Sequence, residues 1–214
     1  MKLTRALRLA AVDLYHQAWR LIILNALLGG AIVAVVFATL AVRPAIVLSV
    51  LIGPVIAAVM HCAVTLAQTE DLRLRELVIG LRRHWRRGLA LGLAVLVAAL
   101  LGAFALPFYA RAGHFGWFFV ALSVYVLLAF ALVQLVLWPL AVFESSAPLR
   151  EVARDALRAI ARRPAASLGL GAALLLINVV GVAAAILPFL TLTIAYSFLV
   201  SAHFALPKSP IREA

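Results

Sequence analysis

Five long segments without any Asp, Glu, Lys or Arg interrupt this sequence, and they constrain its fold more than any other feature. They cover residues 21–42, 44–69, 88–110, 112–143 and 164–207. A membrane-spanning helix needs about 20 consecutive, mostly apolar residues, so each segment is long enough to cross a bilayer. The last segment would form a single helix of about 66 Å, roughly twice the hydrocarbon thickness. We therefore divide it near Leu187, Pro188 and Phe189.

Composition places the chain in the membrane class. Of its 214 residues, 66% are hydrophobic and only 13% are charged, which is too apolar for a soluble globular protein. We predict an all-α, polytopic integral membrane bundle that forms a single domain over residues 1–214. Its six transmembrane helices are expected to pair as three hairpins. The expected spans are residues 21–42, 44–69, 88–108, 116–141, 165–186 and 188–206.

Basic residues flank these spans unevenly. If the N-terminus is cytoplasmic, 17 of the 19 Lys and Arg residues lie on the cytoplasmic side, and only Arg43 and Arg111 lie outside. Short loops follow the positive-inside rule, so we expect a multi-pass protein with both termini in the cytoplasm. The formal net charge of +11 then reflects topology and contact with anionic headgroups, and we expect no nucleic-acid binding.

Three basic amphipathic segments precede the hairpins, at residues 3–20, 70–87 and 148–163. We expect them to be elbow helices that lie in the cytoplasmic headgroup layer. The simplest interpretation of their basic faces is a solvated surface anchored to membrane lipid, and the sharper one is docking of a partner protein. We select these arginines for lipid or partner binding: Arg82, Arg83, Arg86, Arg87, Arg150, Arg154, Arg158, Arg162 and Arg163.

The spans offer little chemistry. Ionisable residues at membrane depth mark catalytic and transport sites, and no Asp, Glu, Lys or Arg lies in a span core, so we expect no enzyme. A metal site is disfavoured because His61 and Cys62 are adjacent and point in different directions on a helix. The sequence contains no cofactor-binding motif, so we expect no cofactor. We expect His203 to reach the cytoplasmic interface. The polar residues we select inside the spans are Asn25, His61, Gln134 and Asn178.

Glycine and proline positions suggest how the spans pack. Gly88 and Gly92 have the four-residue spacing of closely packed membrane helices, and we expect them to serve packing within the bundle. Gly53 and Pro54 interrupt the second span. Interrupted spans also occur in transporters, so this break and the three amide side chains motivate an alternative function, a channel or uniporter for a neutral small solute.

Four sequence motifs follow one another along most of the chain. They are GPVIAA at 53–58, LRRHWRRG at 81–88, WPLAVFE at 138–144, and DALR at 155–158 with RRP at 162–164. In their order and spacing the chain resembles the YesL family, small bacterial membrane proteins of unknown function. The resemblance implies a location in the bacterial inner membrane. Because family members often lie beside carbohydrate-uptake genes, it also implies an accessory role near a sugar transporter.

Taken together, these observations predict a non-catalytic inner-membrane protein. Its basic elbows would bind anionic lipid and a partner, with a link to carbohydrate uptake that the resemblance alone implies.

Overall fold

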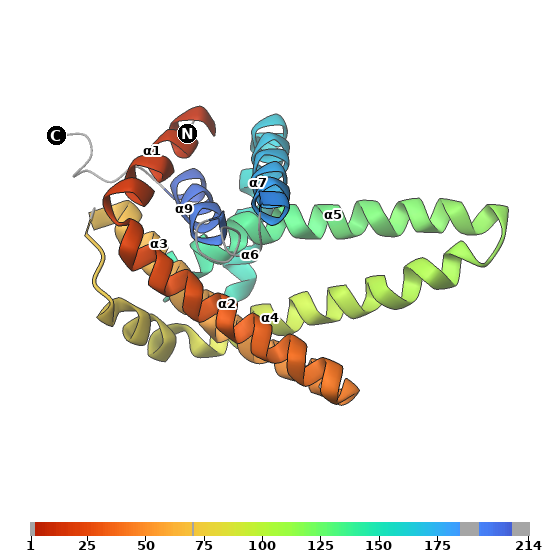
Figure 1. Cartoon of the computed structure of the whole chain (residues 1–214). Helices are drawn as coiled ribbons and strands as arrows, with labels where there is room; N and C mark the ends of the chain where they lie inside the picture. The colour runs from red at the N-terminus through yellow and green to blue at the C-terminus, as the bar shows by residue number, and fades with distance from the viewer. Residues whose placement is uncertain (1–2, 70, 185–192, 207–214) are drawn as a thin grey trace.

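The computed structural model describes residues 3–69, 71–184 and 193–206, and every regular element within these ranges is a helix (Figure 1). No strand occurs in this part of the chain. In order, the elements are α1 (Leu3–His16), α2 (Ala18–Ala41), the 3₁₀ helix η1 (Arg43–Leu51), α3 (Ile52–Thr69), α4 (Arg75–Ala110), α5 (His114–Phe143), α6 (Leu149–Arg162), α7 (Pro164–Ala184) and α9 (Ile194–Ala205).

Within the described ranges, five helical segments are long and apolar enough to cross a membrane. By length and composition, the chain is a multi-pass membrane protein. The five segments are Ala18–Ala41, Ile46–Thr69, Arg75–Ala110, His114–Phe143 and Pro164–Ala183.

The sixth predicted span, residues 188–206, is not confirmed. Its described part is α9, which has 12 residues and extends about 18 Å, against about 30 Å of hydrocarbon. The predicted break at Leu187, Pro188 and Phe189 lies outside the described residues.

The second elbow and the third span were predicted as separate helices, and this was wrong. They form one continuous helix, α4, whose 36 residues extend about 54 Å. Gly88 lies at the predicted boundary, but one glycine costs only about 1 kcal/mol inside a helix and does not end it. The basic part of α4 therefore continues the axis of the apolar part. Figure 1 shows α4 and α5 projecting from the rest of the molecule as a long hairpin. Gly113, between the two helices, has a left-handed backbone conformation (φ 74°).

The predicted second span changes helix type at the interruption. Residues 43–51 form η1, and the α-helical pattern begins only at Ile52. Pro54 has no backbone N–H, so it cannot donate the α-helical hydrogen bond to the carbonyl of Val50. The chain before Pro54 is wound as a tighter 3₁₀ helix instead.

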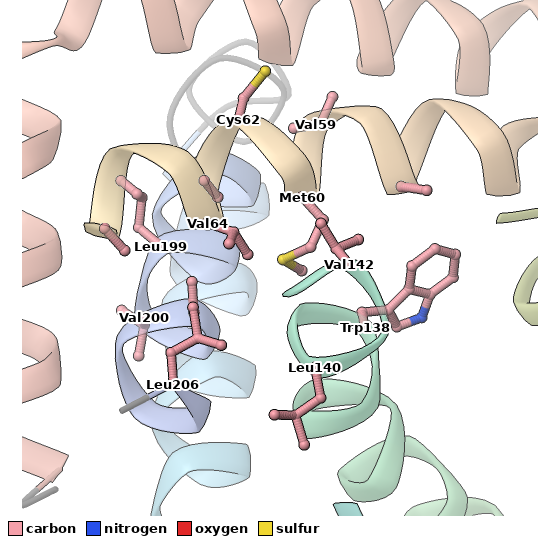
Figure 2. Packing of buried hydrophobic residues seen from close by; sticks show 14 of the residues in the cluster. Val59, Met60, Cys62, Val64, Trp138, Leu140, Val142, Leu199, Val200 and Leu206 are labelled. Atoms are coloured by element: carbon pink, nitrogen blue, oxygen red, sulfur yellow. The ribbon is translucent and has the colours of Figure 1, made fainter. Parts of the chain in front are cut away.

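The core is centred on α3, which packs chiefly against α4 and also against α5 and α9. Figure 2 shows side chains of α3, such as Met60 and Val64, among those of α5 and α9. The three predicted hairpins are not confirmed as the packing units. α4 and α5 do pair, but α3 packs more extensively on α4 than on α2, and α9 packs on α1, α3 and α5 more than on α7.

Candidate functional site

One stripe of α4 faces α3 at four-residue intervals, and its small members bring the two backbones into contact. A Cβ atom at Gly88 would lie 2.6 Å from the Cα atom of Pro54, and a Cβ atom at Gly53 would lie 2.2 Å from the Gly88 carbonyl oxygen. Only glycine fits at these positions without a shift of one helix. The predicted packing role of Gly88 and Gly92 within the bundle is therefore confirmed. The stripe consists of Glu76, Gly80, His84, Gly88 and Gly92.

A histidine pair and a glutamate lie at the N-terminal end of this stripe. Gly80 leaves room for the His61 ring, because a Cβ atom at Gly80 would lie 2.8 Å from the Cβ atom of His61. The His61 Nε2 atom is 3.5 Å from a Glu76 carboxylate oxygen, and the rings of His61 and His84 are 5.2 Å apart between centroids. His61 thus makes an interhelical polar contact.

His84 was not selected from the sequence, although it is the most buried member of this group. Its side chain is 1% exposed, and neither ring nitrogen has a hydrogen-bond partner. The signal that could have identified His84 is its position in the four-residue repeat with Gly80 and Gly88. Over the described residues, no three His, Cys, Asp or Glu side chains are grouped so that they could hold a metal ion.

Two of the nine selected arginines, Arg83 and Arg87, contact the junction between α5 and α6; Arg87 is half-buried and Arg83 is exposed. Arg87 donates hydrogen bonds to the carbonyl oxygens of Ala141 at 2.7 Å and Glu144 at 2.9 Å, and also to that of Ala147. The last carbonyls of a helix lack intrahelical partners, so Arg87 caps the end of α5. Arg83 donates to the Ser145 hydroxyl at 2.7 Å.

The other selected arginines are exposed. On α6 the side chains of Val152 and Ala156 are buried, and the arginines project from the rest of the helix surface, as an amphipathic helix requires. Arg158 pairs with Asp155 at 3.0 Å. We call these seven exposed arginines, which exclude Arg83 and Arg87, the arginine surface. It comprises Arg82, Arg86, Arg150, Arg154, Arg158, Arg162 and Arg163.

The first and second basic segments also meet. Arg20, at the start of α2, donates to a carboxylate oxygen of Asp71 at 3.0 Å and to the carbonyl oxygen of Leu72. The hydrogen bond from Arg20 holds the pKa of the Asp71 carboxyl below its usual value. Together with the bonds from Arg83 and Arg87 to the α5–α6 junction, this contact brings the three basic segments to one end of the molecule.

A buried acid–base pair joins the two ends of the chain. His203 Nε2 lies 2.7 Å from a carboxylate oxygen of Asp13, and both side chains are buried. The Tyr196 hydroxyl donates to the Leu7 carbonyl at 3.0 Å, so α1 and α9 run side by side in the same direction. Asp13 was missed, although Ala6, Ala10 and Asp13 fall on one buried stripe of α1. This contact holds His203 in the protein interior.

The three selected amides lie in different surroundings. The Asn178 side chain donates to the Ser197 hydroxyl at 2.9 Å and to the Leu174 carbonyl at 2.7 Å. Asn25 is completely buried, and its amide has no hydrogen-bond partner. Gln134 lines a pocket of about 510 Å³ between α3, α4 and α5, whose other lining residues are mostly apolar. The described residues therefore do not gather these amides along one polar path.

Comparison with known proteins adds no identification. No family model, no curated protein and no solved structure matches the chain. The resemblance to the YesL family is untested by these comparisons and stays a prediction.

Proposed function

We propose that this chain is a non-catalytic protein of the bacterial inner membrane whose arginine surface binds anionic lipid headgroups and docks a partner protein. The observation that carries the proposal is the meeting of the three basic segments at one end of the bundle. Arg20 contacts Asp71 and Leu72, and Arg83 and Arg87 contact the α5–α6 junction. These contacts leave seven exposed arginines on the helices beside them.

The chemistry of this end suits an anionic membrane surface. A Lys or Arg side chain near such a surface contributes about 1 kcal/mol to binding, so several arginines together give a substantial attraction. Trp19 and Trp85 are both exposed, and the guanidinium groups of Arg20 and Arg86 lie over their rings. Exposed tryptophans beside arginines are typical of the boundary between lipid and water.

The proposal includes six crossings with both termini in the cytoplasm. Arg20 begins α2 and Asp71 follows α3, so their contact supports a chain that leaves one side of the membrane and returns to it through α2, η1 and α3. Arg87 contacts carbonyls at the end of α5, which supports the same return through α4 and α5. In this topology α7 and the predicted sixth span make the last pair of crossings.

The alternative of a channel or uniporter for a neutral solute has weaker support. A path for a polar solute needs hydrogen-bonding groups along it, whereas the pocket beside Gln134 is lined mostly by apolar side chains. The Asn178 amide is engaged by Ser197 and by its own helix.

Lipid retention tests the first part of the proposal. The protein is purified in a mild detergent, and bound phosphatidylglycerol and phosphatidylcholine are counted by native mass spectrometry. A variant with Arg150→Gln, Arg154→Gln, Arg158→Gln and Arg162→Gln should lose phosphatidylglycerol. The control Arg111→Gln, at the exposed turn of the α4–α5 hairpin, should retain it. Equal retention of both lipids by all three proteins would contradict lipid binding by the arginine surface.

Co-purification tests the docking part. The unmodified chain should bring down a discrete membrane partner, which the YesL resemblance would make a component of a sugar transporter, and the four-arginine variant should not. A chain that always emerges alone, with or without the four arginines, would count against docking.

Cysteine labelling tests the topology. Cys62 is buried and is first replaced by alanine, and single cysteines are then placed at Arg82, Arg158 and Arg111. A membrane-impermeant maleimide should label the first two from the cytoplasmic side and the third from the opposite side. Labelling of Arg82→Cys and Arg158→Cys from different sides would refute the topology.

A further inference from the structure

A buried histidine without a hydrogen bond lies at the contact between α3 and α4. His84 is 1% exposed, and neither of its ring nitrogens has a hydrogen-bond partner among the described residues. Its ring lies 5.2 Å from the ring of His61 on α3, measured between the centroids. A buried polar group without a partner is costly, so packing alone would favour an apolar side chain at this position.

The ionisable groups around His84 are bases. They are His61 from α3, and Arg83 and Arg87 from α4 itself. From the end of α5, Glu144 approaches this group through its backbone carbonyl, which accepts a hydrogen bond from Arg87. A proton on the buried ring would therefore place a cation beside two arginines, without a hydrogen-bond acceptor among the described residues. Such a cation is unfavourable in the protein interior.

His61 differs from His84 because it has an acidic partner. Its Nε2 atom is 3.5 Å from a Glu76 carboxylate oxygen. Glu76 also lines an open polar cleft of about 260 Å³, together with Thr65 and Thr69. His61 can therefore carry a proton in place, as an ion pair with Glu76 beside this cleft. His84 has no such partner within the described part of the chain.

The close contact of the helices leaves His84 no room to reach water. A Cβ atom at Gly80 would lie 2.8 Å from the Cβ atom of His61, and a Cβ atom at Gly88 would lie 2.6 Å from the Cα atom of Pro54. The two helices thus touch on both sides of His84 along α4. A charged His84 can reach water only if α3 and α4 separate between these two glycines.

We propose that His84 is an acid-sensitive latch between α3 and α4. At neutral pH the uncharged ring completes the contact. In acid the ring takes up a proton, and the helices separate between Gly80 and Gly88 so that the imidazolium reaches water. The open form binds the proton more readily, so the closed contact is favoured above about pH 6.5, where free histidine is neutral, and is weakened as the pH falls. This inference is independent of the arginine surface.

Stability measured at two pH values tests the latch. A histidine that is neutral when folded and titrates normally when unfolded makes the unfolding constant rise about thirtyfold between about pH 7.5 and pH 5.0. His84→Leu removes this group, so its unfolding constant should rise about thirtyfold less over that range than the constant of the unmodified protein. The control His114→Leu makes the same change at an exposed histidine and should keep the original pH dependence. Each full chain is titrated from a mild detergent into SDS at both pH values.

Hydrogen exchange followed by mass spectrometry locates the opening in the unmodified protein. Amide protection is corrected for the intrinsic exchange rate at each pH. We expect it to fall in acid by about tenfold or more in residues 57–64 of α3 and 78–88 of α4, because local separation exposes these backbones. Residues 118–130 of α5 should keep their protection.

Two results would overturn the proposal. The same pH dependence of unfolding in the unmodified protein and in His84→Leu would show that protonation of His84 is not linked to the contact. Protection that does not change in acid, or that falls equally in α3, α4 and α5, would show that acid does not open this contact. The exchange measurement holds even if His84→Leu fails to fold.

Discussion

Replacing Gly88 by alanine tests the close contact between α3 and α4. The added Cβ atom would lie 2.6 Å from the Cα atom of Pro54 and 2.8 Å from both the Gly53 carbonyl oxygen and the Pro54 nitrogen. Ordinary van der Waals contact begins at 3.4 Å, so α3 and α4 must separate by about 0.8 Å. All three neighbours are backbone atoms that cannot rotate away. Overpacking of this kind costs about 1 to 3 kcal/mol, and we expect Gly88→Ala to destabilise the protein by that amount.

Gly30→Ala is the matched control. Gly30 also lies inside an apolar helix, α2, but nothing lies within 4 Å of a Cβ atom placed there. Because alanine favours the helix over glycine by up to about 1 kcal/mol, this variant should be neutral or more stable. The free energies of unfolding are compared by titrating each purified protein from a mild detergent into SDS and following tryptophan fluorescence.

A second alanine at the α3–α4 contact is expected to add little further destabilisation. Gly53→Ala should cost about as much as Gly88→Ala, because its Cβ atom would lie 2.2 Å from the Gly88 carbonyl oxygen. Once either change has separated the helices, the other meets less resistance, so the double variant should be less destabilised than the sum of the two. Equal stabilities of Gly88→Ala and Gly30→Ala, or simple additivity of the two alanines, would refute the close contact of α3 and α4.

Three further substitutions test the buried polar groups in the same unfolding assay. Arg87→Leu should cost about 2 to 3 kcal/mol of stability, because carbonyls at the end of α5 lose a charged donor. The control Arg86→Leu, at an exposed position, should change stability by no more than about 0.5 kcal/mol. Equal effects of the two substitutions would contradict capping of α5 by Arg87. His203→Leu should cost about 3 to 5 kcal/mol, because it leaves the Asp13 carboxylate buried without its histidine, and a loss below 1 kcal/mol would contradict a buried pair. His84→Leu should be neutral or stabilising, because it removes two buried nitrogens that lack hydrogen bonds, and a clear destabilisation would show that His84 has a partner.

The sequence predicted the helices well where only length and polarity matter. The third elbow was expected at residues 148–163 and α6 is Leu149–Arg162; the next span was expected from residue 165 and α7 begins at Pro164. Apolar length is enough to require a helix in lipid, because the backbone must satisfy its own hydrogen bonds there. The same reasoning failed at Gly88. The change from basic to apolar residues marks a boundary of polarity, and backbone hydrogen bonding continues through it.

The roles of individual side chains depend on neighbours that the sequence does not reveal. Arg86 and Arg87 look alike in the chain, yet Arg86 is exposed and Arg87 caps α5, because only Arg87 faces the end of that helix. His203 was expected to reach the cytoplasmic interface, and the sequence did not reveal that it is buried against Asp13, a residue from the opposite end of the chain. The glycine spacing of α4 was informative, since helix approach of this kind depends on residue size at fixed intervals.

The Asp13–His203 pair has a consequence for biosynthesis. The two residues are 190 positions apart, and ribosomes add about 5 to 20 residues per second. The aspartate therefore waits about 10 to 40 s after its own synthesis before its histidine is made. During that interval α1 lacks the contacts that His203 and Tyr196 of α9 make with it in the folded protein. A chain that stops before Tyr196 makes neither contact, so these two links between α1 and α9 form only after α9 has been synthesised.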